Sequence, residues 1–152
     1  MPNTPLMVNS GATVFTCAEG VTDSDRAFAR NIFGDLGIVY ELGEILMDAV
    51  TALSGSGPAY FFEMIAALTA AGKAVGLPEE VALDLTVQTA AGAAKMVQEG
   101  LGSPDNLRDA VTSPGGTTAA GLTVLKHVEF REIVAAMVRA ARDRSIELGS
   151  SE

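Results

Sequence analysis

Apolar residues in the first 44 positions follow two different periods. Residues 12–18 (ATVFTCA) are rich in β-branched and aromatic side chains, which predicts a strand. Thr22 and Asp25 have the spacing of a capping box, and apolar residues then recur at every fourth position until Gly37. This pattern predicts an amphipathic helix of about three turns, followed by a second strand over residues 38–42. The recurring residues are Phe28, Ile32 and Leu36.

The strand–helix–strand order of residues 1–44 is incomplete as a fold. Two strands do not form a stable sheet by themselves, and such a unit normally joins a larger sheet. No other strand pattern follows in the chain. We therefore expect these strands to belong to a sheet whose other strands are not in this sequence.

The pattern becomes helical from residue 45 to residue 152. Ile45–Leu53 predicts a short helix, which Ser54–Gly57 breaks, and Pro58 takes the first position of the next helix. Further helices are predicted over residues 59–75, 78–99, 103–111, 118–127 and 129–148. The expected fold class is mainly α, with an all-helical domain preceded by the small strand–helix–strand unit.

The predicted helix over residues 59–75 is apolar on nearly every face, because Glu63 and Lys73 are its only charged residues. Such a helix has to be buried on nearly every face. A chain of 152 residues offers too little of its own surface to cover it, so a second copy is the simplest cover. We expect a homodimer, with Glu63 bonded to a partner group at the helix surface or the interface.

Composition and charge narrow the classes of function. Hydrophobic residues make up 48% of the chain and charged residues 19%, which excludes an intrinsically disordered protein. The net charge of −9 argues against binding to nucleic-acid phosphates or anionic membrane surfaces. No membrane span is predicted, no basic residue precedes Arg26 to suggest a secretory signal, and the lone Cys17 cannot form an internal disulfide. We expect a cytoplasmic protein in which Cys17 is a small buried residue of the first strand.

Two glycine-rich segments precede predicted helices. In Thr112–Thr118 (TSPGGTT) hydroxyls and free N–H groups meet at a helix start, so this segment is either a carboxylate or phosphate site or a capped turn. In Ser54–Pro58 (SGSGP) a sharp turn with tight helix packing is the preferred interpretation over an anion site. Neither segment is a P-loop or a Rossmann nucleotide loop, because no Lys follows the glycines and the three-glycine spacing after a strand is missing. His127 has no Cys or second His with which to form a metal site.

Five stretches together carry a resemblance to a known family. They are MPNTP (1–5), LMDAVTALSGSGPAYFF (46–62), AAGKAVGLP (70–78), QTAAGAAKM (88–96) and LRDAVTSPGGTTAAGL (107–122). The similarity covers the whole chain in order, and the combination of SGSGPAY with a later VTSPGGTT is specific. The chain resembles pyrroline-5-carboxylate reductase, the last enzyme of proline biosynthesis.

The resemblance implies a two-domain oxidoreductase of which this chain carries the second part. In the family an N-terminal Rossmann domain binds NADPH or NADH, and a helical C-terminal domain forms an interwoven dimer that often assembles into rings. Residues 1–44 would be the C-terminal end of the Rossmann domain, and residues 45–152 the dimerisation and substrate-binding domain. The Gly-rich nucleotide loop has no counterpart here, so we expect the chain alone to be an inactive fragment. A non-enzymatic helical homodimerisation module is the alternative.

The resemblance also assigns site residues. They are Ser113, Gly116, Thr117 and Thr118 for the substrate carboxylate, Thr51 and Glu44 near the substrate, and Asn3, Thr4 and Pro5 on the cofactor side. The Thr118 hydroxyl would bond the imine nitrogen of the pyrroline ring, while hydride reaches the adjacent carbon. The chain departs from the family pattern twice: Ala110 stands where some members have a polar cofactor contact, and Leu101 lies in a loop that often carries an acid. No metal is implied.

Overall fold

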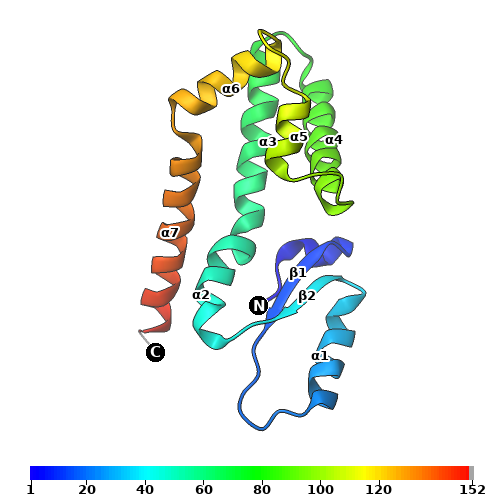
Figure 1. Ribbon diagram of the computed structural model, residues 1–152, viewed down its shortest axis with the longest axis vertical. Helices are drawn as coiled ribbons and strands as arrows, with labels where there is room; N and C mark the ends of the chain where they lie inside the picture. The colour runs from blue at the N-terminus through cyan, green and yellow to red at the C-terminus, as the bar shows by residue number, and fades with distance from the viewer. Residues whose placement is uncertain (151–152) are drawn as a thin grey trace. The chain divides into compact units, whose positions relative to one another are not determined.

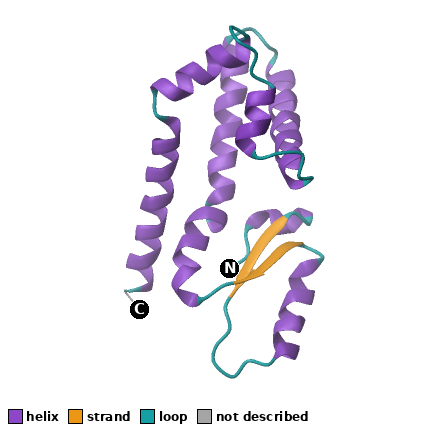
Figure 2. Ribbon diagram, viewed as in Figure 1, coloured by secondary structure: helices purple, strands orange, loops and turns teal. Residues whose placement is uncertain are grey.

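The computed structural model describes residues 1–150, and Figures 1 and 2 show the order of its elements. The N-terminal elements are η1 (Thr4–Val8), β1 (Gly11–Phe15), α1 (Asp23–Gly34), β2 (Gly37–Glu41), η2 (Glu44–Leu46), α2 (Met47–Val50) and η3 (Thr51–Gly55). They are followed by α3 (Gly57–Ala74), α4 (Glu79–Gln98), α5 (Pro104–Ala110), α6 (Thr117–His127) and α7 (Phe130–Gly149). The predicted fold class, mainly α with a small strand–helix–strand unit, is confirmed.

The chain divides into two compact units. The first comprises Met1–Phe61 together with the C-terminal segment that begins at Val134, and the second comprises Phe62–Ile133. Helices α3 and α7 therefore contribute residues to both units. The strands and the 3-10 and π turns lie in the first unit, and helices α4, α5 and α6 lie in the second.

Strands β1 and β2 form a parallel pair that begins with Gly11 opposite Gly37. Gly37 has a φ of +144°, and a Cβ at this position would overlap the carbonyl oxygen of Gly11, so the close start of the two strands requires glycine. Helix α1 connects the strands, and its predicted capping box is present. The Asp25 N–H donates to Thr22 Oγ1 at 3.2 Å, and the Thr22 N–H donates to the Asp25 carboxylate at 3.1 Å.

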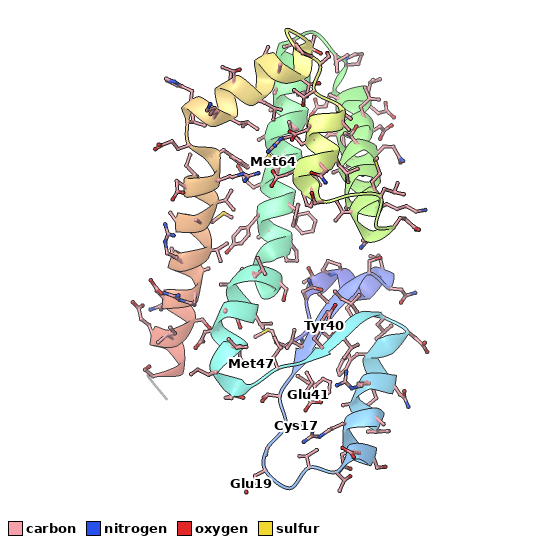
Figure 3. The ribbon with its side chains drawn as sticks, viewed as in Figure 1. Cys17, Glu19, Tyr40, Glu41, Met47 and Met64 are labelled. Carbon is pink, nitrogen blue, oxygen red and sulfur yellow. The ribbon has the colours of Figure 1, made fainter. Side chains whose placement is uncertain are left out.

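The first strand ends earlier than the sequence predicts. Its last paired residue is Phe15, because the partner strand ends at Glu41 and the N–H of Leu42 closes the ladder on the Phe15 carbonyl at 3.0 Å. Cys17 therefore lies in the loop before α1, where it is half-buried (Figure 3), and its predicted place as a buried residue of the strand is wrong. Leu36 likewise lies beyond the end of α1, just before β2.

The helical path is hardly interrupted at the first glycine-rich segment. Thr51–Gly55 form a π turn that closes with the Ser56 N–H donating to the Thr51 carbonyl at 2.8 Å. Ser56 itself keeps right-handed helical backbone angles, so the predicted break over residues 54–57 is reduced to a single bend. The helix predicted over residues 45–53 is in fact a 3-10 turn, a short α-helix and the π turn in succession.

The helices of the second unit begin and end close to their predicted limits. Helix α4 is followed by Gly100 with a φ of +70°, and the Ser103 hydroxyl caps α5 by accepting from the Asn106 N–H at 3.2 Å. Helices α3 and α4 approach closely at one point. A Cβ on Gly72 would lie 3.0 Å from the Cβ of Ala82, so small residues at both positions permit this approach.

Few apolar side chains are buried within one chain. Among the described residues, Val14, Ala52 and Ala82 are the buried hydrophobic ones. Large side chains of α3 remain exposed instead, with Phe61 at 70% and Leu68 at 50%. None of the helices in the described part of the chain is long and apolar enough to cross a membrane. The apolar surface of α3 is therefore left without cover by the chain itself.

Candidate functional site

The second glycine-rich segment differs from the first because it reverses the chain before a helix. Gly115 has a φ of +71°, and Gly116, the N-cap of α6, is extended with a φ of −77° and a ψ of 173°. The Gly116 N–H donates to the Ser113 carbonyl at 3.0 Å, which closes a tight turn. Thr117 is the first residue of α6. The left-handed conformation at Gly115 is one that other residues adopt only with strain.

Gly116 is also crowded by the side chain beside it. A Cβ at position 116 would overlap Ser113 Oγ and would lie 3.2 Å from the Ser113 carbonyl oxygen. Any larger residue would therefore displace the Ser113 hydroxyl. The sequence-based assignment placed the substrate carboxylate on the Gly116 backbone, but the N–H of Gly116 is already bonded. Gly116 contributes by lacking a side chain.

Unbonded polar groups meet at the start of α6. No side chain caps this helix, and the N–H groups of Thr117, Thr118 and Ala119 have no acceptor within their own helix. The hydroxyls of Ser113 and Thr118 make no hydrogen bond to any of the described residues; Ser113 is exposed and Thr118 half-buried. Free N–H groups at the positive end of a helix dipole favour a carboxylate or phosphate. The N–H groups can bind a small anion, and a hydroxyl can bond a second polar atom of the same ligand.

The neighbouring Thr112 shows what a purely structural hydroxyl does in this region. Its Oγ1 donates to the Arg108 carbonyl at 2.6 Å and so caps the end of α5. The segment Thr112–Thr118 thus combines both interpretations that the sequence allows: it is a capped turn at its start and an open polar site at its end.

The other predicted site residues lie in the first unit, and several of them are already bonded. Thr51 Oγ1 donates to the Met47 carbonyl at 2.9 Å, so its hydroxyl points back onto its own helix. Glu44 is exposed at the first position of η2. Thr4 and Pro5 open η1 and make no side-chain hydrogen bond to a described residue. Their contact with a cofactor stays a prediction.

Asn3 is bonded at both ends of its side-chain amide. Its Nδ2 donates to the Ser54 carbonyl at 3.1 Å, and its Oδ1 accepts from the Ala12 N–H at 2.9 Å. The structure thereby brings the N-terminal segment to the π turn that carries Thr51. Sequence reasoning missed this contact, although one signal was present: Pro58 stands four residues after Ser54 and has no N–H to satisfy its carbonyl.

Charged residues of the second unit gather around α5 and the start of α7. Asp105 forms ion pairs with Arg131 and with Arg108, the latter at 2.7 Å. The hydrogen bond from Arg131, and then the charges of both arginines, hold the pKa of Asp105 below its ordinary value. This pairing connects the elements on either side of α6.

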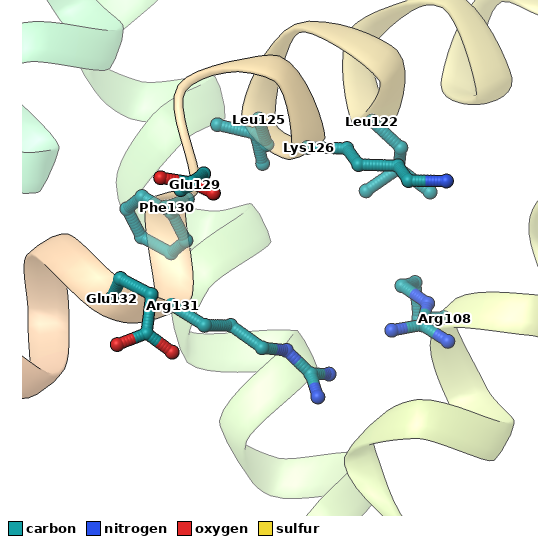
Figure 4. Close-up of a pocket in the computed structure, with 8 residues that line it drawn as sticks. All are labelled: Arg108, Leu122, Leu125, Lys126, Glu129, Phe130, Arg131 and Glu132. Atoms are coloured by element: carbon teal, nitrogen blue, oxygen red, sulfur yellow. The ribbon is translucent and has the colours of Figure 1, made fainter.

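A pocket of about 610 Å³ lies beside these ion pairs, between α5, α6 and the start of α7 (Figure 4). Its apolar lining comes from Leu122, Leu125 and Phe130, and Arg108 and Arg131 point toward it. None of the predicted site residues lines this pocket. It is formed by the later turns of α6, whereas the open polar groups lie at the first turn. No cluster of metal-ligating side chains occurs in the part of the chain that the structure describes.

Known proteins match the chain over nearly its whole length. A protein named pyrroline-5-carboxylate reductase from Arabidopsis thaliana is 48% identical over 151 residues, which is 99% of this chain and 55% of that protein. One from Synechocystis is 47% identical over 149 residues, which is 98% of this chain and 56% of that protein. The chain thus spans about half the length of the curated relatives it matches.

Solved structures agree with these relatives. The crystal structure of Plasmodium falciparum pyrroline carboxylate reductase with NADP bound matches with a TM-score of 0.92 and 38% identity, over 98% of this chain and 61% of that one. The Coxiella burnetii pyrroline-5-carboxylate reductase matches with a TM-score of 0.93 and 42% identity, over 97% and 55% of the two chains. A family profile described as pyrroline-5-carboxylate reductase dimerisation covers residues 44–148. On these grounds the chain belongs to the pyrroline-5-carboxylate reductase family, and residues 44–148 carry its dimerisation domain.

Proposed function

We propose that this chain supplies the dimer-forming and substrate-binding part of a pyrroline-5-carboxylate reductase. The reaction is the reduction of the C=N bond of 1-pyrroline-5-carboxylate to L-proline. The observation that carries the proposal is the start of α6, where three N–H groups and two hydroxyls are free to meet a small carboxylate. Family membership tells which carboxylate to expect, since the relatives are named for pyrroline-5-carboxylate.

This geometry supports the substrate-side roles that the family resemblance assigns. The carboxylate takes the N–H groups of Thr117 and Thr118 and the hydroxyl of Ser113, where the helix dipole also favours negative charge. The half-buried Thr118, the second residue of α6, holds the ring nitrogen through its hydroxyl so that the adjacent carbon is presented to the reductant. Glu44 and Thr51 are proposed as further substrate-side residues on the strength of the family resemblance.

A nicotinamide cofactor, NADPH or NADH, would supply the hydride. The residues of this chain do not fit the main binding site of a dinucleotide, because such a site needs a Gly-rich turn between a first strand and a helix N-terminus. Here β1 is followed by the loop of residues 16–22, in which Gly20 is the only glycine. Within these 152 residues the resemblance assigns only Asn3, Thr4 and Pro5 to the cofactor side. We therefore propose that the chain alone does not reduce the substrate.

We propose that the chain forms a homodimer through α3 and its neighbours, and that dimers can assemble further into a ring. The proposed location of the protein is the cytoplasm. The exposed apolar residues of α3 support the dimer, since 70% exposure of Phe61 in water would be unfavourable. The missing Gly-rich turn also keeps a second candidate function open, a helical homodimerisation module without activity of its own.

Calorimetry with L-proline on the full 152-residue chain tests the proposal. We expect weak saturable binding that is lost in Gly116→Ala, because the new Cβ displaces the Ser113 hydroxyl. Gly121→Ala is the matched control: it lies in the same helix, and a Cβ there meets no heavy atom within 4 Å. A folded dimer that binds no proline, or equal loss in both variants, would contradict the proposed site and favour the homodimerisation module.

A further inference from the structure

The Asn3 side chain joins three segments of the first unit. Its amide bonds the Ser54 carbonyl of the π turn at 3.1 Å and the Ala12 N–H of β1 at 2.9 Å, and both bonds are partly buried. The segment before it is held separately, because Met1 exchanges two backbone hydrogen bonds with Val14, at 2.8 and 3.0 Å. The N-terminal segment is thus paired to β1 at Met1, and Asn3 provides its side-chain bond to the π turn.

Pro58 leaves the Ser54 carbonyl free for this bond. In a regular helix this carbonyl would accept from the N–H of residue 58, and proline has none. The next N–H, that of Ala59, donates to the Ser56 carbonyl at 3.0 Å. Asn3 therefore satisfies an acceptor that the helix cannot satisfy, and a π turn is a form of helix that often marks functional positions.

We propose that Asn3 is a positioning residue of the reductase reaction and not a cofactor contact. Its amide holds the segment of Thr4 and Pro5, on the cofactor side, against the π turn that carries Thr51, on the substrate side. This inference rests on the proposed function. The geometry supports this role, because the amide nitrogen and the amide oxygen of Asn3 each bond a backbone group of the chain itself.

The test uses a reductase of full family length that carries these 152 residues. In Asn3→Ala we expect a lower Tm and a kcat reduced between about 10- and 100-fold, the range for a displaced reacting group, with KM for both substrates changed less than about twofold. Asn9→Gly is the matched control, because Asn9 lies in the same segment, its side chain bonds none of the described residues, and glycine adopts its left-handed backbone conformation without strain. It should retain the wild-type kcat.

A double variant separates positioning from a purely structural role. In Asn3→Ala with Pro58→Ala, residue 58 regains an N–H that can satisfy the Ser54 carbonyl, but the bond to the N-terminal segment is still lost. The Tm should return toward that of Pro58→Ala alone, while kcat stays low. If kcat recovers together with Tm, or if Asn3→Ala leaves kcat unchanged, or if it raises only the KM for the dinucleotide, the proposal is overturned. A wild-type protein that does not reduce pyrroline-5-carboxylate overturns the proposed function, and this proposal with it.

Discussion

The two glycine-rich segments of this chain look alike in sequence and differ in structure. Both combine two glycines with at least one serine at the start of a helix. In Ser54–Pro58 the backbone stays helical, so the N–H groups of Ser56 and Ala59 find acceptors in the residues before them, at 2.8 and 3.0 Å. In Ser113–Thr118 the left-handed Gly115 and the extended Gly116 turn the chain away first. The helix that follows then starts with free N–H groups.

The difference shows what makes a helix start available to a ligand. A polar, glycine-rich composition is not sufficient, because a preceding helical turn satisfies the same donors that a ligand would use. What matters is whether the backbone leaves the helical region just before the first turn. The free groups of α6 and the satisfied groups at α3 follow from this one feature. The exposed part of α3 is instead its apolar side, which suits a partner helix.

The largest effect is expected from a charge on that apolar side. Leu68→Asp in α3 should convert the dimer to monomer or unfold it, because each copy loses a buried Leu worth about 1.5–3 kcal/mol and gains a charge that must be desolvated. Light scattering at micromolar concentration measures the mass. Leu68→Met is the control and should remain dimeric. A wild-type chain that is a well-folded monomer would contradict the assignment of α3 to an interface.

Alanine in place of one glycine from each segment should have opposite effects on stability. Gly116→Ala should destabilise by about 0.5–1 kcal/mol, because alanine is a poorer N-cap than glycine and its Cβ has to push Ser113 Oγ aside. Gly55→Ala should stabilise by about 0.4–1 kcal/mol, because its Cβ would make only ordinary contacts, at 3.5 Å or more, and the unfolded chain becomes less flexible. Urea unfolding compares the two variants with wild type. Changes of the same sign would show that the two segments do not differ as described.

Local patterns predicted most of the fold correctly. The capping box at Thr22, the cap at Ser103 and the glycine after α4 are all decided within a few residues, so the sequence alone indicates them. The bond between the π turn and Asn3 was not predicted, because it joins the Ser54 carbonyl to a side chain 51 residues away in the sequence. Cys17 was misplaced for a similar reason: the length of β1 is set by where its partner strand ends.

The site was predicted only in part by the residues themselves. The spacing of Thr112–Thr118 indicated an anion site or a capped turn, and only the backbone angles at Gly115 and Gly116 show that the donors beyond them are free. The substrate came from the resemblance. Apolar residues such as Phe28 stay exposed, at 67%, and no local pattern in the sequence identifies a segment that would pack against them.

The two threonines assigned to the substrate should respond differently to loss of the hydroxyl. In a full-length reductase, Thr118→Ala should lower kcat/KM roughly 2- to 13-fold, which corresponds to the loss of one hydrogen bond worth about 0.5–1.5 kcal/mol. The Tm should change little, because the Thr118 hydroxyl bonds no described residue. Thr51→Ala should mainly lower Tm, because its hydroxyl bonds the Met47 carbonyl. Thr118→Ser keeps the hydroxyl and should retain most activity. Wild-type kinetics in Thr118→Ala would remove its assigned role.

The smallest effect concerns the ion pairs that flank the second segment. Because the pKa of Asp105 is lowered in the folded chain, mainly by the hydrogen bond from Arg131, its contribution to stability is present above the ordinary Asp value of about 3.9 and is lost as the pH falls through the lower folded value. Asp105→Asn should therefore lower the urea midpoint slightly at neutral pH, and the difference from wild type should shrink below about pH 4. The side chains are exposed, so added salt should also reduce it. Asp84→Asn on α4 is the control for the change in net charge, because Asp84 forms no ion pair with a described residue. A difference for Asp105 that is constant down to low pH would mean that the ion pairs do not stabilise the elements around α6.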